Sequence, residues 1–180
     1  LSVLCHPYWD AYGEYNMSTD MLEFLLKNGI FDAFEVCDDD DHTGNGVNLQ
    51  TAMYNQLRAE GYAVPIVGAS DCHNLNSELF GKFFTYVFCD NVANVKQGIA
   101  QLNSVAVERI GNEYRVYGPF RLVKYARFIT DQFEPYITEL KKRYSRQLFI
   151  AVNEGDKQTA SAIESRVAES RKRFFGRTND

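Results

Sequence analysis

The sequence predicts an α/β protein in which parallel strands come first and a mainly helical part follows. Short apolar runs at 31–37 and 64–69 alternate with stretches whose apolar residues recur with a helical period. This order is typical of parallel strands joined by helical crossovers. From Pro119 onward the period stays helical. We therefore divide the chain into a part with parallel strands, 1–90, and a hairpin with a helical extension, 91–180.

The first part opens with an apolar run that stops at His6 and Pro7, where proline ends any pairing in a sheet. Ser18 or Thr19 can cap a helix that runs to about Lys27, before a glycine that supplies a left-handed stop. The elements expected next are a strand over 31–37, a helix over 48–60, and strands over 64–69 and 83–89.

The second part begins with a helix over 92–102. Two runs of alternating apolar and polar residues, 104–108 and 112–117, flank Gly111 and predict a β-hairpin. The helix expected after Pro119 is interrupted by Pro135, and a last helix over 156–174 is capped near Asp156.

Composition limits the classes of function. Hydrophobic residues make up 45% and aromatic residues 14% of the 180 residues, which is enough for a globular core. The formal net charge of −5 disfavours a nucleic-acid surface, because proteins that follow phosphates usually show a basic stripe. No apolar stretch has the length that a membrane span needs.

The four cysteines are Cys5, Cys37, Cys72 and Cys89, and they form no CxxC pairs. This spacing disfavours a zinc ribbon and favours buried thiols in a reducing, cytoplasmic compartment. A contact between Cys5 and Cys72 beside a metal ion stays open as an alternative.

Three side chains have the chemistry and the position of metal ligands. Asp71 and His73 close the apolar run 64–69, and the alternation of side chains across a strand puts both on one face. His6 closes another run, and the carboxyl ends of parallel strands meet at one edge of a sheet. A carboxylate with imidazoles suits Zn, Mn or Fe, which activate water or polarise an oxygen. In the simpler alternative, His6 caps a turn and Asp71 caps the segment after it.

Neighbouring residues are candidates for weaker roles. Tyr8 and Trp9 come just after His6 and Pro7 and are expected to contact substrate, as is His42. Glu35, in the run 31–37, is expected to be structural or to support a ligand. The aspartates at 38–41 favour a solvated loop over a metal site, because crowded like charges prefer water.

The runs Leu4-Cys-His6-Pro7 and Gly68-Ala-Ser-Asp71-Cys-His73 resemble the PHP family, the polymerase and histidinol phosphatase group of metal-dependent phosphoesterases. The resemblance covers about the first half of the chain. It implies the C-terminal part of a distorted (βα) barrel that holds divalent ions at its strand ends, with His6, Asp71 and His73 as ligands. It also implies hydrolysis of a small phosphorylated substrate by a metal-activated water.

The opening His-x-His motif of that family has no counterpart here, because the chain contains only His6, His42 and His73. We therefore expect the C-terminal portion of a longer protein, whose N-terminal half supplies further ligands. Missing first strands would expose a sheet edge, which favours a homo-oligomer or a bound partner chain. Two alternatives stay open: an amidohydrolase-like metal hydrolase, and a noncatalytic assembly or binding module that keeps a remnant metal motif.

Overall fold

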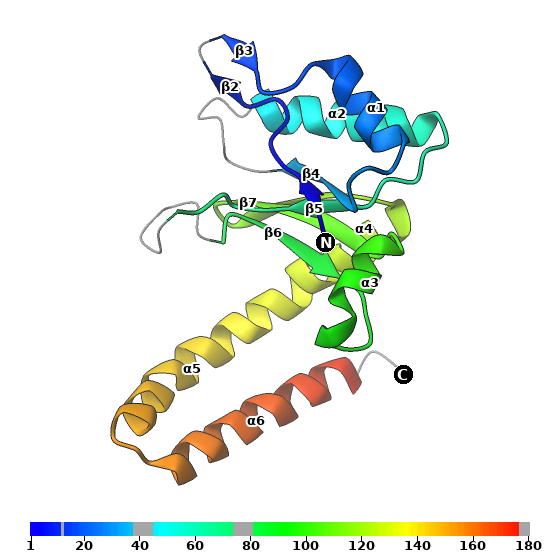
Figure 1. Ribbon diagram of the computed structural model, residues 1–180. Helices are drawn as coiled ribbons and strands as arrows, with labels where there is room; N and C mark the ends of the chain where they lie inside the picture. The colour runs from blue at the N-terminus through cyan, green and yellow to red at the C-terminus, as the bar shows by residue number, and fades with distance from the viewer. Residues whose placement is uncertain (12, 38–44, 74–80, 177–180) are drawn as a thin grey trace. The chain divides into compact units, whose positions relative to one another are not determined.

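A computed structural model of the chain shows a mixed α/β protein (Figure 1), as predicted. The structure describes residues 1–11, 13–37, 45–73 and 81–176. They form two compact units, Leu1–Ala126 and Arg127–Asp180. Among the described residues the parallel strands form a three-stranded sheet, and a closed barrel is not seen.

The parallel sheet has the order β1-β4-β5, with β1 at Val3–Leu4, β4 at Ala33–Cys37 and β5 at Ile66–Gly68. Two helices cover one face of this sheet, α1 over Thr19–Lys27 and α2 over Asn45–Ala59 (Figure 1). These strand and helix predictions are confirmed to within a few residues. A short antiparallel pair, β2 (Asp10–Ala11) and β3 (Glu14–Tyr15), lies in the connection between β1 and α1.

Local chemistry explains how α1 begins and how it is attached. The hydroxyl of Ser18 accepts the N–H of Met21 at 3.4 Å, which caps the helix as predicted. Leu22 and Leu26 of α1 are buried against the same core as Leu57 of α2. Apolar residues that recur at this spacing put one face of each helix into the core.

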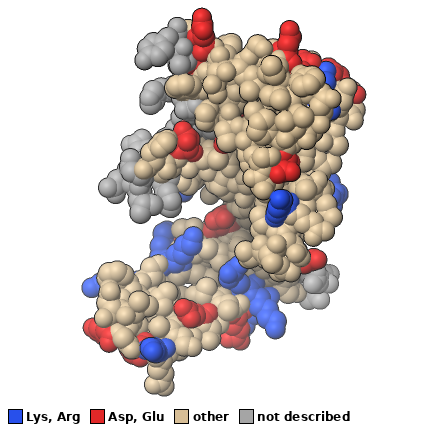
Figure 2. Space-filling model, viewed as in Figure 1, with Lys and Arg blue, Asp and Glu red and all other residues tan. Residues whose placement is uncertain are grey.

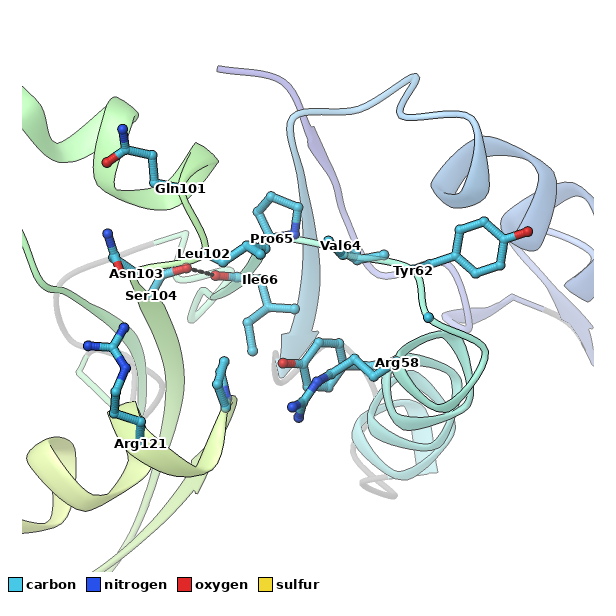
Figure 3. Close-up of a pocket in the computed structure, with 14 residues that line it drawn as sticks. Arg58, Tyr62, Val64, Pro65, Ile66, Gln101, Leu102, Asn103, Ser104 and Arg121 are labelled. Carbon is cyan, nitrogen blue, oxygen red and sulfur yellow. Dashed lines mark hydrogen bonds between the residues drawn. The ribbon is translucent and has the colours of Figure 1, made fainter.

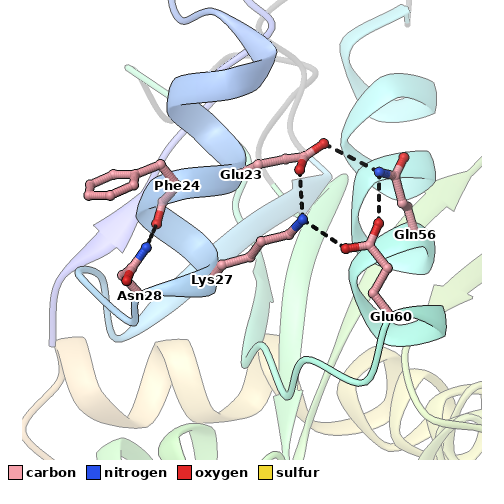
Figure 4. A network of polar contacts seen from close by, with 6 residues as sticks. All are labelled: Glu23, Phe24, Lys27, Asn28, Gln56 and Glu60. Carbon is pink, nitrogen blue, oxygen red and sulfur yellow. Dashed lines mark hydrogen bonds and ion pairs between the residues drawn. The ribbon is translucent and has the colours of Figure 1, made fainter.

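A polar network joins the outer sides of α1 and α2 (Figure 4). The ammonium group of Lys27 lies 2.7 Å from carboxylate oxygens of both Glu23 and Glu60. The amide of Gln56 donates to Glu23 and Glu60 as well, at 3.3 and 3.1 Å. The hydrogen bonds that Lys27 donates to Glu23 and Glu60 raise the pKa of Lys27, and the bond to Glu60 lowers the pKa of that carboxyl.

The second sheet is antiparallel, with β6 at Phe83–Val87, β7 at Ser104–Ile110 and β8 at Glu113–Tyr117. The predicted hairpin is confirmed as β7 and β8. The strand predicted at 83–89 does not continue the parallel series, because β6 pairs antiparallel with β7. The first unit extends to Ala126, so the division expected near residue 90 lies inside this unit.

The two faces of this sheet pack against different partners. Phe83 and Ala106 belong to the same core as the buried leucines of α1 and α2, whereas Val105 and Val107 pack on α4 (Phe120–Phe128). The connection between β6 and β7 contains the short helices η1 (Val92–Asn94) and α3 (Val95–Ala100).

The second unit is a helical hairpin of α5 (Glu134–Asn153) and α6 (Lys157–Gly176), preceded by the π-helical turn η2 (Ile129–Phe133). Pro135 does not interrupt the helix as expected, because it lies in the first turn of α5, where its missing N–H breaks no bond. Asp156 caps α6 by accepting the N–H of Thr159, as predicted. None of the helices in the described part of the chain has the length and apolar character of a membrane span.

Candidate metal centre at the carboxyl edge of the parallel sheet

His6 lies two residues beyond β1, in a turn closed by the N–H of Trp9 donating to its carbonyl oxygen at 3.1 Å. Its own N–H donates to Oε2 of Glu35 at 2.9 Å. Glu35 lies in β4 and is only 3% exposed, so this carboxylate fixes the backbone of His6 from inside the protein. The one signal for this bond in the sequence is an acidic residue, Glu35, in an apolar strand.

Asp71 and His73 follow β5 beyond its last residue, Gly68. Neither residue is in a strand, so the alternation argument used to place them on one face does not apply. Their side chains nevertheless lie together, with His73 Nε2 3.4 Å from Asp71 Oδ2. This separation is longer than a normal hydrogen bond, and the imidazole is 85% exposed. Both groups are therefore accessible from solvent.

The backbone is strained at two of the three predicted ligands. His6 has a φ of 30° and Asp71 a φ of 44°, in the left-handed region that L-residues rarely adopt. Leu102 is the third described non-glycine residue with positive φ. Strain of this kind costs roughly 1–3 kcal/mol per residue and is concentrated at functional sites. The strain at His6 and Asp71 makes the turns after β1 and β5 candidates for a functional site.

The carboxyl end of β4 lies between these turns because β4 is the central strand. Its pairing with β5 shifts register between Glu35 and Cys37, which is the mark of a β-bulge. Neighbouring strands are about 4.8 Å apart, so the backbones after β1 and β5 are separated by roughly 10 Å. A histidine and an aspartate can bridge such a gap through an ion with ligand distances of about 2.0–2.2 Å.

Close packing holds the end of β5 in place. A Cβ on Gly68 would lie 2.7 Å from Cys37 Sγ and 2.9 Å from the carbonyl oxygen of Phe84. The hydroxyl of Thr85 accepts the N–H of Gly68 and donates to its carbonyl oxygen, at 2.9 and 2.8 Å. The antiparallel sheet thus satisfies the edge of β5 just before the Asp71 turn.

A second polar contact lies inside the first unit, on the face of the antiparallel sheet that also carries Phe83 and Ala106. The hydroxyl of Tyr117 donates to Oε2 of the buried Glu108 at 2.8 Å. Burial raises the pKa of Tyr117, and the bond to Glu108 raises it further. The phenol therefore stays protonated and serves as a donor.

The candidates for substrate contacts differ in position. Tyr8 is 5% exposed and belongs to the core. Trp9 is 39% exposed, and its ring lies edge-on to the imidazole of His6 with the centroids 6.5 Å apart. His42 and the aspartates 38–41 lie outside the described residues. None of the four cysteines, which all lie within the described residues, forms a disulfide.

The structure thus brings Asp71 and His73 together and places His6 at the same edge of the sheet. Among the described residues, no group of three or more His, Cys, Asp or Glu side chains is close enough together to hold a metal ion. Comparisons with protein-family models, with curated proteins and with solved structures found no significant match to this chain. The function is therefore inferred from the chemistry of the residues and from the arrangement of the strands.

Proposed function

We propose that the carboxyl edge of the parallel sheet holds divalent metal, Zn, Mn or Fe, and that the protein hydrolyses a small phosphate ester, as its resemblance to the PHP family implies. One observation carries this proposal. His6 and Asp71, which the resemblance makes ligands, both have a strained left-handed backbone and both follow strands of one parallel sheet at the same edge. Glycine at either position would relieve this strain at little cost. Keeping His6 and Asp71 there is favourable if their side chains have a function.

In this proposal His6, Asp71 and His73 are ligands, and the N-terminal part of the same protein supplies the others in a barrel of the PHP type. A divalent ion supplies, when bound, an activated water and a positive charge opposite the phosphoryl oxygens. Glu35 holds the backbone of His6 and so fixes the position from which the imidazole reaches the ion. Trp9 borders the imidazole and limits the approach of substrate.

The charge of the protein supports a role for a cation. Acidic side chains are scattered over the visible face of the first unit (Figure 2), and the formal net charge is −5. A phosphorylated substrate is therefore not attracted by the protein as a whole. A metal ion supplies the local positive charge that binding needs. The wide spacing of the four cysteines, without CxxC pairs, favours a reducing, cytoplasmic compartment.

The test is titration calorimetry of the chain with Mn²⁺ and Zn²⁺, for the wild type and for Asp71→Asn and His73→Ala. Loss of one ligand is expected to weaken metal binding at least tenfold. His42→Ala is the matched control, because it removes an imidazole that we assign to substrate and should leave metal affinity unchanged. Equal metal affinity in the wild type and in both ligand variants would contradict the proposal.

Activity is measured on p-nitrophenyl phosphate with the N-terminal part of the same protein present. We expect turnover that requires added metal and is lost in Asp71→Asn. Cleavage of an amide substrate in place of the phosphate ester would favour the amidohydrolase-like alternative.

A noncatalytic assembly module is the second candidate, and the helical hairpin supports it. Phe149 and Val152 of α5 are 70% and 63% exposed. A cavity of about 480 Å³ between α5 and α6 is lined mainly by apolar side chains, among them Ile137, Leu148 and Val167. Exposed apolar surface of this kind often marks self-association. Light scattering that shows a dimer without metal-dependent activity would favour this candidate.

A further inference from the structure

A cavity of about 460 Å³ opens in the first unit at the amino end of β5 (Figure 3). Its walls are the last turn of α2, the segment 62–66, the turn 101–104 and the start of α4. The predicted ligands Asp71 and His73 follow the other end of the same strand. The volume falls within the range of small-molecule sites. The cavity is therefore distinct from the candidate metal centre.

Two arginines give this cavity a positive charge. Arg58 comes from the last turn of α2 and Arg121 from the first turn of α4, and they lie on either side of Ile66 (Figure 3). Within the described part of the chain, neither guanidinium forms an ion pair with a carboxylate. Guanidinium groups are weakly hydrated and match the geometry of phosphate oxygens.

One of these guanidinium groups is already positioned. It belongs to Arg58 and lies 5.4 Å from the ring centroid of Tyr54, in the range of a cation–π contact. Tyr54 is buried, and burial raises the pKa of its phenol. The ring is thus a fixed, neutral platform. Less side-chain freedom is lost when Arg58 binds an anion, which favours affinity.

Much of the remaining lining is apolar, and Gln101, Asn103 and Ser104 add polar side chains. Ile66 is buried, and its carbonyl oxygen accepts the hydroxyl of Ser104 at 2.7 Å (Figure 3). Pro65 and Pro119 add two rings whose backbone φ is fixed. A ligand with an apolar part can therefore lie on a preformed surface.

Leu102 is the least expected residue in this wall. It follows α3 in a turn where its N–H donates to the carbonyl of Ile99 and the next N–H donates to that of Gly98, each at 2.9 Å. This pair of bonds is the Schellman motif, in which glycine is the usual residue at the left-handed position. Leucine occupies it here with a φ of 61°. The strain has a reason if the side chain is needed in the cavity that it lines.

We propose that this cavity binds a small organic phosphate, with the phosphate between Arg58 and Arg121 and the apolar part on Pro65, Leu102 and Pro119. Two cationic groups match a phosphate monoester, which carries close to two negative charges at neutral pH. A carboxylate would use only one of them fully. This inference is independent of the proposed hydrolase, because it uses none of the predicted metal ligands.

The test is titration calorimetry with phenyl phosphate in the presence of EDTA, so that no metal-dependent binding contributes. We expect saturable binding, with benzoate and inorganic phosphate each at least tenfold weaker. Arg58→Gln and Arg121→Gln should each weaken binding of phenyl phosphate about tenfold, as the loss of one charge-assisted hydrogen bond implies. Both residues are exposed, so both variants are expected to fold. Arg173→Gln in α6 is the control and should bind like the wild type.

Leu102→Gly separates binding from folding. It should bind phenyl phosphate more weakly while its melting temperature stays level or rises, because glycine relieves the strained φ. Nuclear magnetic resonance should place the shift changes at 101–104 and near Arg121. Absence of saturable binding would overturn the proposal, as would equal affinity in the wild type and the two glutamine variants. Equal affinity for benzoate would overturn the assignment to phosphate.

Discussion

The two ends of β5 carry opposite chemistry on one short strand. Asp71 and His73 lie beyond its carboxyl end, and their side chains are suitable ligands for a cation. At its amino end, Arg58 and Arg121 line a cavity that suits an anion. Each end has a strained non-glycine residue, Asp71 at one and Leu102 at the other. The ends of one strand can thus position groups of either charge, and the chemistry of these residues decides which ligand each end can take.

The largest effect is expected from Gly68→Ala, at the carboxyl end of β5. Its Cβ would lie 2.7 Å from Cys37 Sγ and 2.9 Å from a backbone oxygen, so we expect a loss of about 3 kcal/mol in the free energy of unfolding. Urea unfolding measures this loss. Metal binding should weaken more than binding of phenyl phosphate, because the clash is at the metal end.

Gly176→Ala is the control for this variant, because a Cβ there meets nothing within 4 Å. Its stability should stay within about 0.5 kcal/mol of the wild type. If Gly68→Ala were as stable as this control, the close packing of β5 on the antiparallel sheet would be wrong.

Glu35→Ala should cost about 2 kcal/mol in the free energy of unfolding, because it leaves the N–H of His6 without its carboxylate acceptor. Glu35→Gln keeps a carbonyl acceptor and should lose less. Both values come from urea unfolding, and metal affinity should fall in the same order. Binding of phenyl phosphate should not change in either variant. Equal stability of the alanine and glutamine variants would show that the bond to His6 does not hold the turn.

Asp71→Gly and Leu102→Gly form a matched pair at the two ends of β5. Each should raise the free energy of unfolding by up to about 1 kcal/mol, because glycine adopts positive φ without strain. The first should abolish metal binding only, and the second should weaken phenyl phosphate binding only. Thermal unfolding and calorimetry on the same samples test both statements. A loss of stability in both variants would show that neither turn is strained.

The smallest effect is expected in the network between α1 and α2. The pKa of Glu60 is lowered from 4.5 by the hydrogen bond from Lys27, so its contribution to stability is present above the unfolded pKa. The contribution is lost as the pH falls through the folded pKa. Glu60→Gln should therefore melt below the wild type at pH 7 and equal to it near about pH 2.

Glu139→Gln is the control, because its exposed pair with Lys142 contributes little to stability. A difference between wild type and Glu60→Gln that did not depend on pH would exclude the ion pair as its cause.

Sequence reasoning predicted much of the secondary structure, because capping and hydrophobic periodicity act locally. Ser18 begins α1 and Asp156 caps α6 as expected. The partner of β6 was not predictable, since an apolar strand followed by a helix can pair in either direction. Pro135 is expected to break a helix, but it lies in the first turn of α5, after a π-helical turn that the sequence does not reveal.

The two sites differ in how far the sequence could predict them. His6 and Asp71 are predicted as ligands because each follows an apolar run, so the strand ends are visible in the sequence. The bond from His6 to Glu35 depends on the pairing of β1 with β4, which no local pattern encodes. The cavity with Arg58 and Arg121 brings α2, α4 and the turn 101–104 together, and neither arginine belongs to a recognisable motif.

In the proposed function, two separate turns at the carboxyl edge of one parallel sheet share a divalent cation. Anomalous scattering from crystals grown with Zn²⁺ tests it most directly. We expect a peak about 2.0–2.2 Å from a side-chain nitrogen of His6 and from a carboxylate oxygen of Asp71. A peak bound to only one of these residues, or no peak at this edge, would contradict it.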